Sequence, residues 1–135
     1  NKLDVCIGDI GGICKLQTTS KQKMGPFVTY LPWEYRKDIT KLKCNETVAV
    51  WFIGIIIMQL LSNDIREVHD LNGLFHWSIV STVKTKEDEE AYLKDLQYEI
   101  DFYKKKCPML TEIFDLDPKK RPTIKKLLKD KNLIN

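Results

Sequence analysis

The stretch "VAVWFIGIIIMQLL", residues 48 to 61, is the most apolar part of the chain. It is shorter than the roughly 20 residues that cross a bilayer, and it contains a glycine and a glutamine, so we interpret it as a buried segment. Its β-branched residues would also suit a buried strand, and periodicity alone does not decide between the two. Asn45 or Thr47 as an N-cap, and the polar residues 62 to 64 as a stop, favour a helix. A helix that is apolar on all sides predicts other helices packed around it.

An amphipathic helix is predicted over "KEDEEAYLKDLQYEIDFYKKKCP", residues 86 to 108. Acids occupy its expected first turn, lysines its expected last turn, and Pro108 would end it. Thr85 and Asp88 have the spacing of a capping box. The predicted buried stripe has spacings of three and four and consists of Leu93, Leu96, Ile100, Tyr103 and Cys107.

Two shorter helices are predicted near the carboxyl end. "MLTEIFDLD", residues 109 to 117, is typical of a short helix. "TIKKLLKDKNLI" begins at Thr123 as an N-cap and is expected to bury Ile124, Leu127 and Leu128 while its lysines face water.

The first ten residues have a different pattern. Leu3, Val5 and Ile7 alternate with polar residues before a run of glycines, as in a short strand that leads into a turn. The sequence therefore predicts a mainly α fold with a short β segment at the N-terminus.

Composition limits the classes of function. The chain has 135 residues, is 43% apolar and 30% charged, and carries a net charge of +3. Because lysines and acids are interspersed, we expect neither nucleic acid nor a membrane as a partner. The cysteines form no C-x-x-C pair, and with no signal peptide in view we expect reduced thiols in a cytoplasmic or nuclear protein. A zinc site with His69 and His76 lacks the usual ligand spacing. The four cysteines are Cys6, Cys14, Cys44 and Cys107.

The order of short motifs along the chain resembles the C-terminal lobe of a eukaryotic protein kinase. "IGDIGG" stands where that family has its metal-binding D-F-G, and "YLPWE" where it has A-P-E. "VWFIGIIIMQLL" stands in place of the central D-V-W-S-x-G helix, and "LDPKKRPTIKKLL" in place of the junction of the last two helices. The likeness runs from Val5 to Leu128 and is weak between residues 64 and 107.

The resemblance implies a division of this chain, residues 1 to 135, as a partial kinase-like domain. The activation segment would span 9 to 34 and the central buried helix about 47 to 61. The variable helical region would span 64 to 107 and the final helices 109 to 131. The implied fold class is the helical C-lobe of the protein kinase-like fold.

The resemblance also implies an ion pair between distant residues. In the family, the arginine of the R-P motif pairs with the glutamate of A-P-E, and these positions are Arg121 and Glu34 here. The alternative is that Arg121 belongs to a solvated turn, with Pro122 as a helix starter.

Most of the catalytic motifs of a protein kinase have no counterpart in this sequence. Asp9 matches the D-F-G aspartate and is the one possible magnesium ligand, whereas the glycine-rich loop, the lysine and the catalytic loop would all lie upstream of Asn1. We therefore expect no catalytic residue and no cofactor in this chain alone, with Mg-ATP bound only if the upstream part is present. The chain would be a fragment of a longer kinase-like protein or a free-standing half.

Three departures from the family pattern favour a pseudokinase. Ala49 replaces an aspartate that accepts hydrogen bonds from the catalytic loop, and Phe27 stands where Ser/Thr kinases have a threonine, although Thr29 is close by. Pro32 and Trp33 replace the alanine and proline of A-P-E. We expect a regulator that binds a protein, namely a kinase or a kinase substrate. The first alternative is a fragment of an active Ser/Thr kinase, and the second is an unrelated helical interaction domain.

Two further surfaces are candidates for function. Thr18, Thr19 and Ser20 lie where kinases are switched by phosphorylation, and nearby lysines would pair with a phosphate, although such a run is equally typical of a solvated linker. "LFHWSIV", residues 74 to 80, offers Phe75 and Trp77 as an interface. The alternative is that both rings belong to the core.

Overall fold

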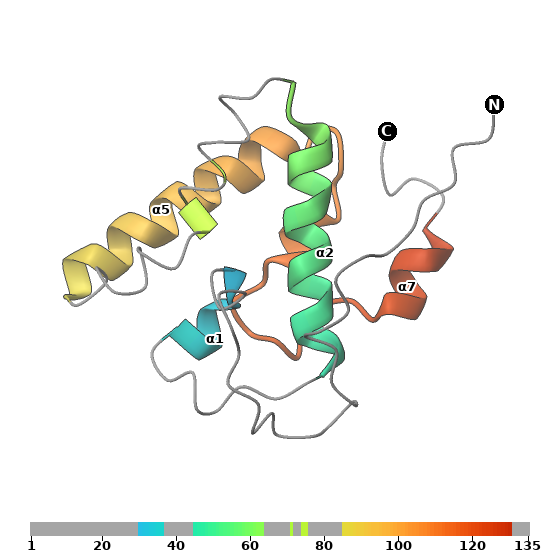
Figure 1. Cartoon of the computed structure of the whole chain (residues 1–135), viewed down its shortest axis with the longest axis horizontal. Coiled ribbons are helices and arrows are strands. Elements are labelled where there is room, and N and C mark those ends of the chain that lie inside the picture. The colour runs from blue at the N-terminus through green and yellow to red at the C-terminus, as the bar shows by residue number, and fades with distance from the viewer. Residues whose placement is uncertain (1–29, 37–44, 64–70, 72–73, 76–84, 131–135) are drawn as a thin grey trace.

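The computed structural model describes residues 30–36, 45–63, 71, 74–75 and 85–130 (Figure 1). All regular structure within these ranges is helical, which confirms the mainly α class. The short β segment predicted near the N-terminus lies outside the described residues. The helices are α1 (Trp33–Arg36), α2 (Glu46–Leu61), α5 (Lys86–Tyr103), α6 (Leu110–Ile113) and α7 (Ile124–Lys129).

Helix α2 is the central element, with α5 on one side of it and α7 on the other (Figure 1). Of the two predicted caps, Asn45 is the N-cap, because its Oδ1 accepts a hydrogen bond from the Val48 backbone N–H at 3.0 Å. Thr47 is already helical and donates its hydroxyl to the same oxygen at 2.7 Å. The helix ends at Leu61, followed by Ser62 as its C-cap. The prediction of a buried central helix is confirmed on most of its circumference, while Ile56 and Leu60 stay exposed.

An aromatic cluster fills the space between α2 and the segments around it. Trp51 meets Phe114 edge-on with ring centroids 4.9 Å apart, and Phe75 stacks on Phe114 at 5.7 Å. Gly54 lets α6 lie directly against α2, since a Cβ at this position would clash with the Ile113 side chain of α6 and would lie 2.8 Å from Cζ of Phe114. The glycine therefore sets the distance between the central helix and the segment that follows α5.

Helix α5 begins with the predicted capping box. The Thr85 hydroxyl accepts from the Asp88 backbone N–H at 3.1 Å, and the Asp88 carboxylate accepts from the Thr85 N–H at 2.9 Å. The helix ends at Tyr103, so the prediction that the lysines form its last turn is wrong. They follow the helix, because the chain turns there toward Cys107. The buried stripe is Tyr92, Leu96, Ile100, Tyr103 and Cys107, and the predicted Leu93 is only partly buried.

Helix α7 is capped by Thr123, as predicted, since its hydroxyl accepts from the Lys126 backbone N–H at 3.1 Å. Leu127 is buried and Ile124 is partly buried, but Leu128 is 82% exposed. The prediction that Leu128 is buried is wrong. Successive helical residues point about 100° apart, so a helix that contacts the core on one narrow side buries only one of two adjacent leucines.

Candidate functional site

The structure describes three of the residues that the sequence nominated for a site, namely Glu34, Arg121 and Phe75. The candidate magnesium ligand Asp9, the candidate phosphosites and Trp77 lie outside the described residues, as does Phe27. The candidate site among the described residues therefore centres on Arg121 and the side chains around it.

Arg121 and Glu34 form a two-pronged ion pair across 87 positions of sequence. Nη1 of Arg121 donates to Oε1 of Glu34 at 2.8 Å, and Nη2 donates to Oε2 at 2.7 Å. Parallel bonds of this kind fix the planes of both groups and are stronger than neutral hydrogen bonds. The Arg121 side chain is fully buried, and the Glu34 side chain is 19% exposed. The predicted ion pair is thus present, and the alternative of a solvated turn at Arg121 is wrong.

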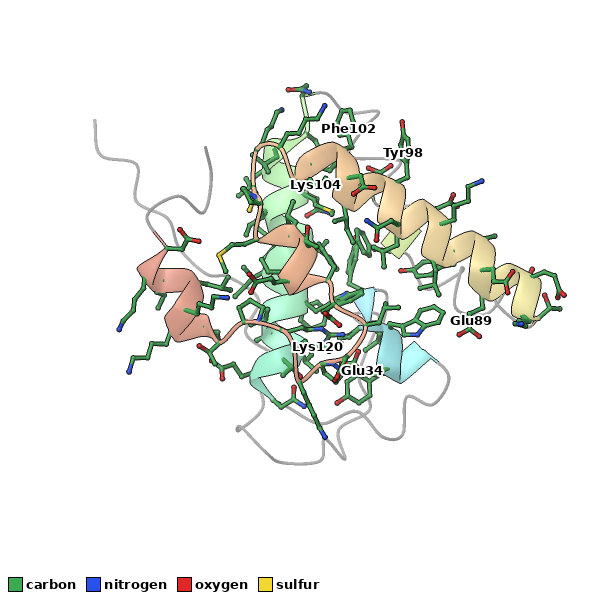
Figure 2. The ribbon with its side chains drawn as sticks, turned by 180° about the vertical axis from the view of Figure 1, so that it is seen from behind. Glu34, Glu89, Tyr98, Phe102, Lys104 and Lys120 are labelled. Carbon is green, nitrogen blue, oxygen red and sulfur yellow. The ribbon has the colours of Figure 1, made fainter. Side chains whose placement is uncertain are left out.

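The remaining donors of Arg121 reach two other segments. Its Nε donates to the Asp115 carbonyl at 2.9 Å, and Nη1 also reaches the Thr47 carbonyl at 3.3 Å. The guanidinium carbon lies 4.7 Å from the ring centre of Trp51, which adds a cation–π contact. One side chain therefore joins α1, the first turn of α2 and the loop after α6. Figure 2 shows Glu34 on α1, beside the loop that carries Lys120.

Helix α1 has two anchors besides the ion pair. Trp33 stacks on Tyr92 of α5 with centroids 5.4 Å apart and planes 11° from parallel. The Tyr35 hydroxyl accepts from Nδ2 of Asn45 at 3.4 Å, next to the start of α2. Four residues of helix are thereby fixed against three other segments. Sequence reasoning missed the Trp33–Tyr92 stack, because it placed Leu93 and not Tyr92 on the buried stripe. The spacing of Tyr92 from Leu96 and Ile100 is the signal that could have found it.

A second link ties α2 to the last helix. Oε1 of Glu46, at the start of α2, accepts a hydrogen bond from the Ile124 backbone N–H at 2.7 Å. This carboxylate lies in the first turn of its own helix and also satisfies an amino-terminal N–H of α7, where negative charge is favoured. Sequence reasoning did not predict it, because nothing local to either residue indicates a partner 78 positions away.

Phe75 belongs to the core. It is fully buried and its ring contacts both Trp51 and Phe114, so its assignment to an interface is wrong and the core alternative holds for this residue. The physical reason is that its ring completes the aromatic cluster against α2, which leaves no surface for a partner.

Among the described residues, two groups have shifted pKa values. Burial raises the pKa of the Cys107 thiol, which keeps it protonated at neutral pH. The hydrogen bond from Lys104 lowers the pKa of Asp101 on the exposed side of α5. Within the described ranges, no three histidine, cysteine, aspartate or glutamate residues lie close enough to hold a metal ion. In the same part of the chain, no helix has the length and apolarity to span a membrane.

No family model matches the chain, and neither a curated protein nor a solved structure matches it at a significant level.

Proposed function

We propose that the chain is the C-terminal lobe of a divergent protein kinase-like domain, a pseudokinase that acts by binding a kinase or a kinase substrate. The observation that carries the proposal is the two-pronged pair of Glu34 and Arg121. Glu34 comes from "YLPWE" and Arg121 from "DPKKRPT", and the residue that lies under the guanidinium is Trp51 of the V-W-x-x-G helix. Three motifs that are far apart in sequence therefore meet at one buried cation, and the resemblance implies the pairing of two of them, through Glu34 and Arg121.

The central helix supports binding over catalysis. Ala49, in the first turns of α2, presents a methyl group at the position where the resemblance implies an aspartate that accepts hydrogen bonds. A methyl group accepts none. Trp33 replaces the proline of A-P-E and is committed to Tyr92 of α5, so the end of this segment is fixed by packing. A surface held by packing, without that hydrogen-bond acceptor, suits a protein-binding role.

An active Ser/Thr kinase is the second candidate, because Asp9 retains the D-x-G pattern. If the gene encodes residues before Asn1, their sequence discriminates between the two. A histidine-arginine-aspartate motif followed by an asparagine five residues later would support the enzyme. Substitution of that aspartate would support the pseudokinase.

The proposal is tested by binding measurements with purified proteins. The chain is immobilised and exposed to a panel of Ser/Thr kinase catalytic domains and their protein substrates, and the phosphoryl transfer of each kinase is measured with and without the chain. We expect at least one member to bind and its transfer rate to change. Phosphate transfer by the chain itself, or no binding across the whole panel, would contradict the proposal. Arg121→Met is the control variant, because it removes the ion pair with Glu34 on which the proposal rests.

We also propose that the sequence segment before α1 is phosphorylated, as the resemblance to protein kinases implies. Thr18, Thr19 and Ser20 are the expected acceptors, and mass spectrometry of protein from its native cell is the measurement. Repeated absence of phosphate from all three side chains would contradict this proposal.

A further inference from the structure

The chain segment that includes α7, residues 119 to 129, carries charge of one sign. Between residues 119 and 129 the chain has no carboxylate, and its lysines are all exposed, namely Lys119, Lys120, Lys125, Lys126 and Lys129. Lys126 is paired with Glu112, which leaves the others as a positive surface. Leu128 stands among them with 82% of its area exposed. Residues three and four apart share a helix face, so we define the basic face of α7 as Lys125, Leu128 and Lys129.

The outer side of α5 has the opposite character. Its amino-terminal half, residues 86 to 95, holds five carboxylates against two lysines. Farther along the same side, Tyr98 is 68% exposed and Phe102 is 47% exposed. We define the acidic face of α5 as Glu87, Ala91, Asp95, Tyr98 and Phe102, which are all exposed.

These two faces cannot meet within one molecule. In Figure 1, α7 and the amino-terminal half of α5 lie at opposite ends of the described structure, with α2 between them. Figure 2, seen from behind, shows the same separation, with Tyr98 and Phe102 on the carboxyl-terminal half of α5. Each face combines exposed apolar area with charge, and the signs of the two faces are opposite.

We propose that the basic face of α7 docks on the acidic face of α5 of a second copy of this chain. Leu128 would pack on Ala91 and Tyr98 of the second copy, with the lysines beside Glu87 and Asp95. Charge complementarity favours a second copy of this chain as the partner, because the acidic face that matches the basic face of α7 is present on the chain itself. The two faces differ, so the contact is head-to-tail and leaves a free face at each end of the pair. This inference does not depend on the kinase-like assignment.

The first test is sedimentation velocity of the whole chain over a range of concentrations. At low salt we expect a sedimentation coefficient that rises with concentration above that of a 15.8 kDa monomer. At 1 M salt, where the Debye length is about 3 Å, the rise should largely disappear. A single monomeric species at low salt up to about 1 mM, the weak end of the usual affinity scale, would overturn the proposal.

Two variants with neutral substitutions separate the faces. The α7 variant is Lys125→Ala with Leu128→Ser and Lys129→Ala, and the α5 variant is Asp95→Asn with Tyr98→Ser. All five side chains are exposed, so both variants should retain the thermal melt of the parent chain. Each variant alone should associate at least about tenfold more weakly than the parent chain.

An equimolar mixture of the two variants provides the decisive outcome. Each supplies the face that the other lacks, so the mixture should form a one-to-one dimer and nothing larger. A mixture that stays monomeric would overturn the proposal. The matched control is Leu60→Ser, which removes a leucine of similar exposure, 74%, from α2 and should leave association unchanged. Loss of association in this control would assign the contact to α2 instead.

Discussion

At the scale of single residues, Arg121 decides how the described segments fit together. A lysine would keep the charge but lose the two-pronged bond to Glu34 and the Nε bond to the Asp115 carbonyl. The planar guanidinium also lies over Trp51, a position that an ammonium group fills poorly. The residue therefore contributes shape as well as charge.

The energetic coupling of this pair is the first prediction. Glu34→Gln should lower the free energy of unfolding by about 2–4 kcal/mol, because it strands a buried cation. The loss falls at the low end of the range for buried pairs because Glu34 is partly exposed. Chemical denaturation of the parent chain, Glu34→Gln, Arg121→Met and the double variant completes a double-mutant cycle, which gives the coupling energy of the two side chains. Effects that add within about 0.5 kcal/mol would show that the two side chains are not coupled.

Gly54 gives a second prediction. Gly54→Ala should lower the free energy of unfolding by about 1–3 kcal/mol through overpacking against Phe114, although alanine is the better helix former by about 1 kcal/mol. Thermal or chemical denaturation measures the change. Ile56→Ala, on the exposed side of the same helix, is the control and should have the smaller effect. Stabilisation by Gly54→Ala would mean that α6 does not lie as close to α2 as described.

The Cys107 thiol gives a prediction about pH. Because its folded-state pKa is raised, stability from this group is fully present below the usual thiol pKa of about 8.5 and is lost as pH rises through the folded-state value. The unfolding free energy of the parent chain should therefore fall more steeply above that pH than that of Cys107→Ala. Denaturation curves at several alkaline pH values measure the two slopes. Equal slopes would show that the thiol pKa is not raised by folding.

At the scale of elements, helix α1 is too short to be stable alone and is held by its contacts. Its ion pair joins it to the loop after α6, and the Trp33–Tyr92 stack joins it to α5. We predict a coupling of about 0.5–1.5 kcal/mol between Trp33 and Tyr92 in a cycle of Trp33→Leu, Tyr92→Leu and the double variant. Replacing both rings leaves apolar volume in place, so the cycle isolates the stacking. A coupling near zero would show that the rings merely lie near each other.

The sequence predicted those elements whose signals are local. The capping box at Thr85, the cap at Thr123 and the start of α2 near Asn45 or Thr47 follow from side chains that bond their own helix. The pairing of Glu34 with Arg121 was implied by the order of motifs, since no local pattern connects residues 87 positions apart. The Glu46–Ile124 bond and the exposure of Leu128 were not predicted, because both depend on where α7 meets the rest of the molecule.

At the scale of the whole molecule, we propose a kinase-like helical lobe that binds a protein and does not itself transfer phosphate. Asp9 is the one residue of this chain that the resemblance connects with a nucleotide. Magnesium depends on substrate phosphates and water as co-ligands, so a lone carboxylate should hold it weakly. The adenine and phosphates of a bound nucleotide would need contacts that these motifs do not supply.

Calorimetric titration of the purified chain with Mg-ATP is the most direct test of this claim. We predict heats no larger than those of dilution at nucleotide concentrations up to about 1 mM, the weak end of the usual affinity range. A dissociation constant in the micromolar range, about −8 kcal/mol, would contradict the account. Loss of that binding in Asp9→Ala would then place the nucleotide at the D-x-G segment and return the chain to the class of active kinases.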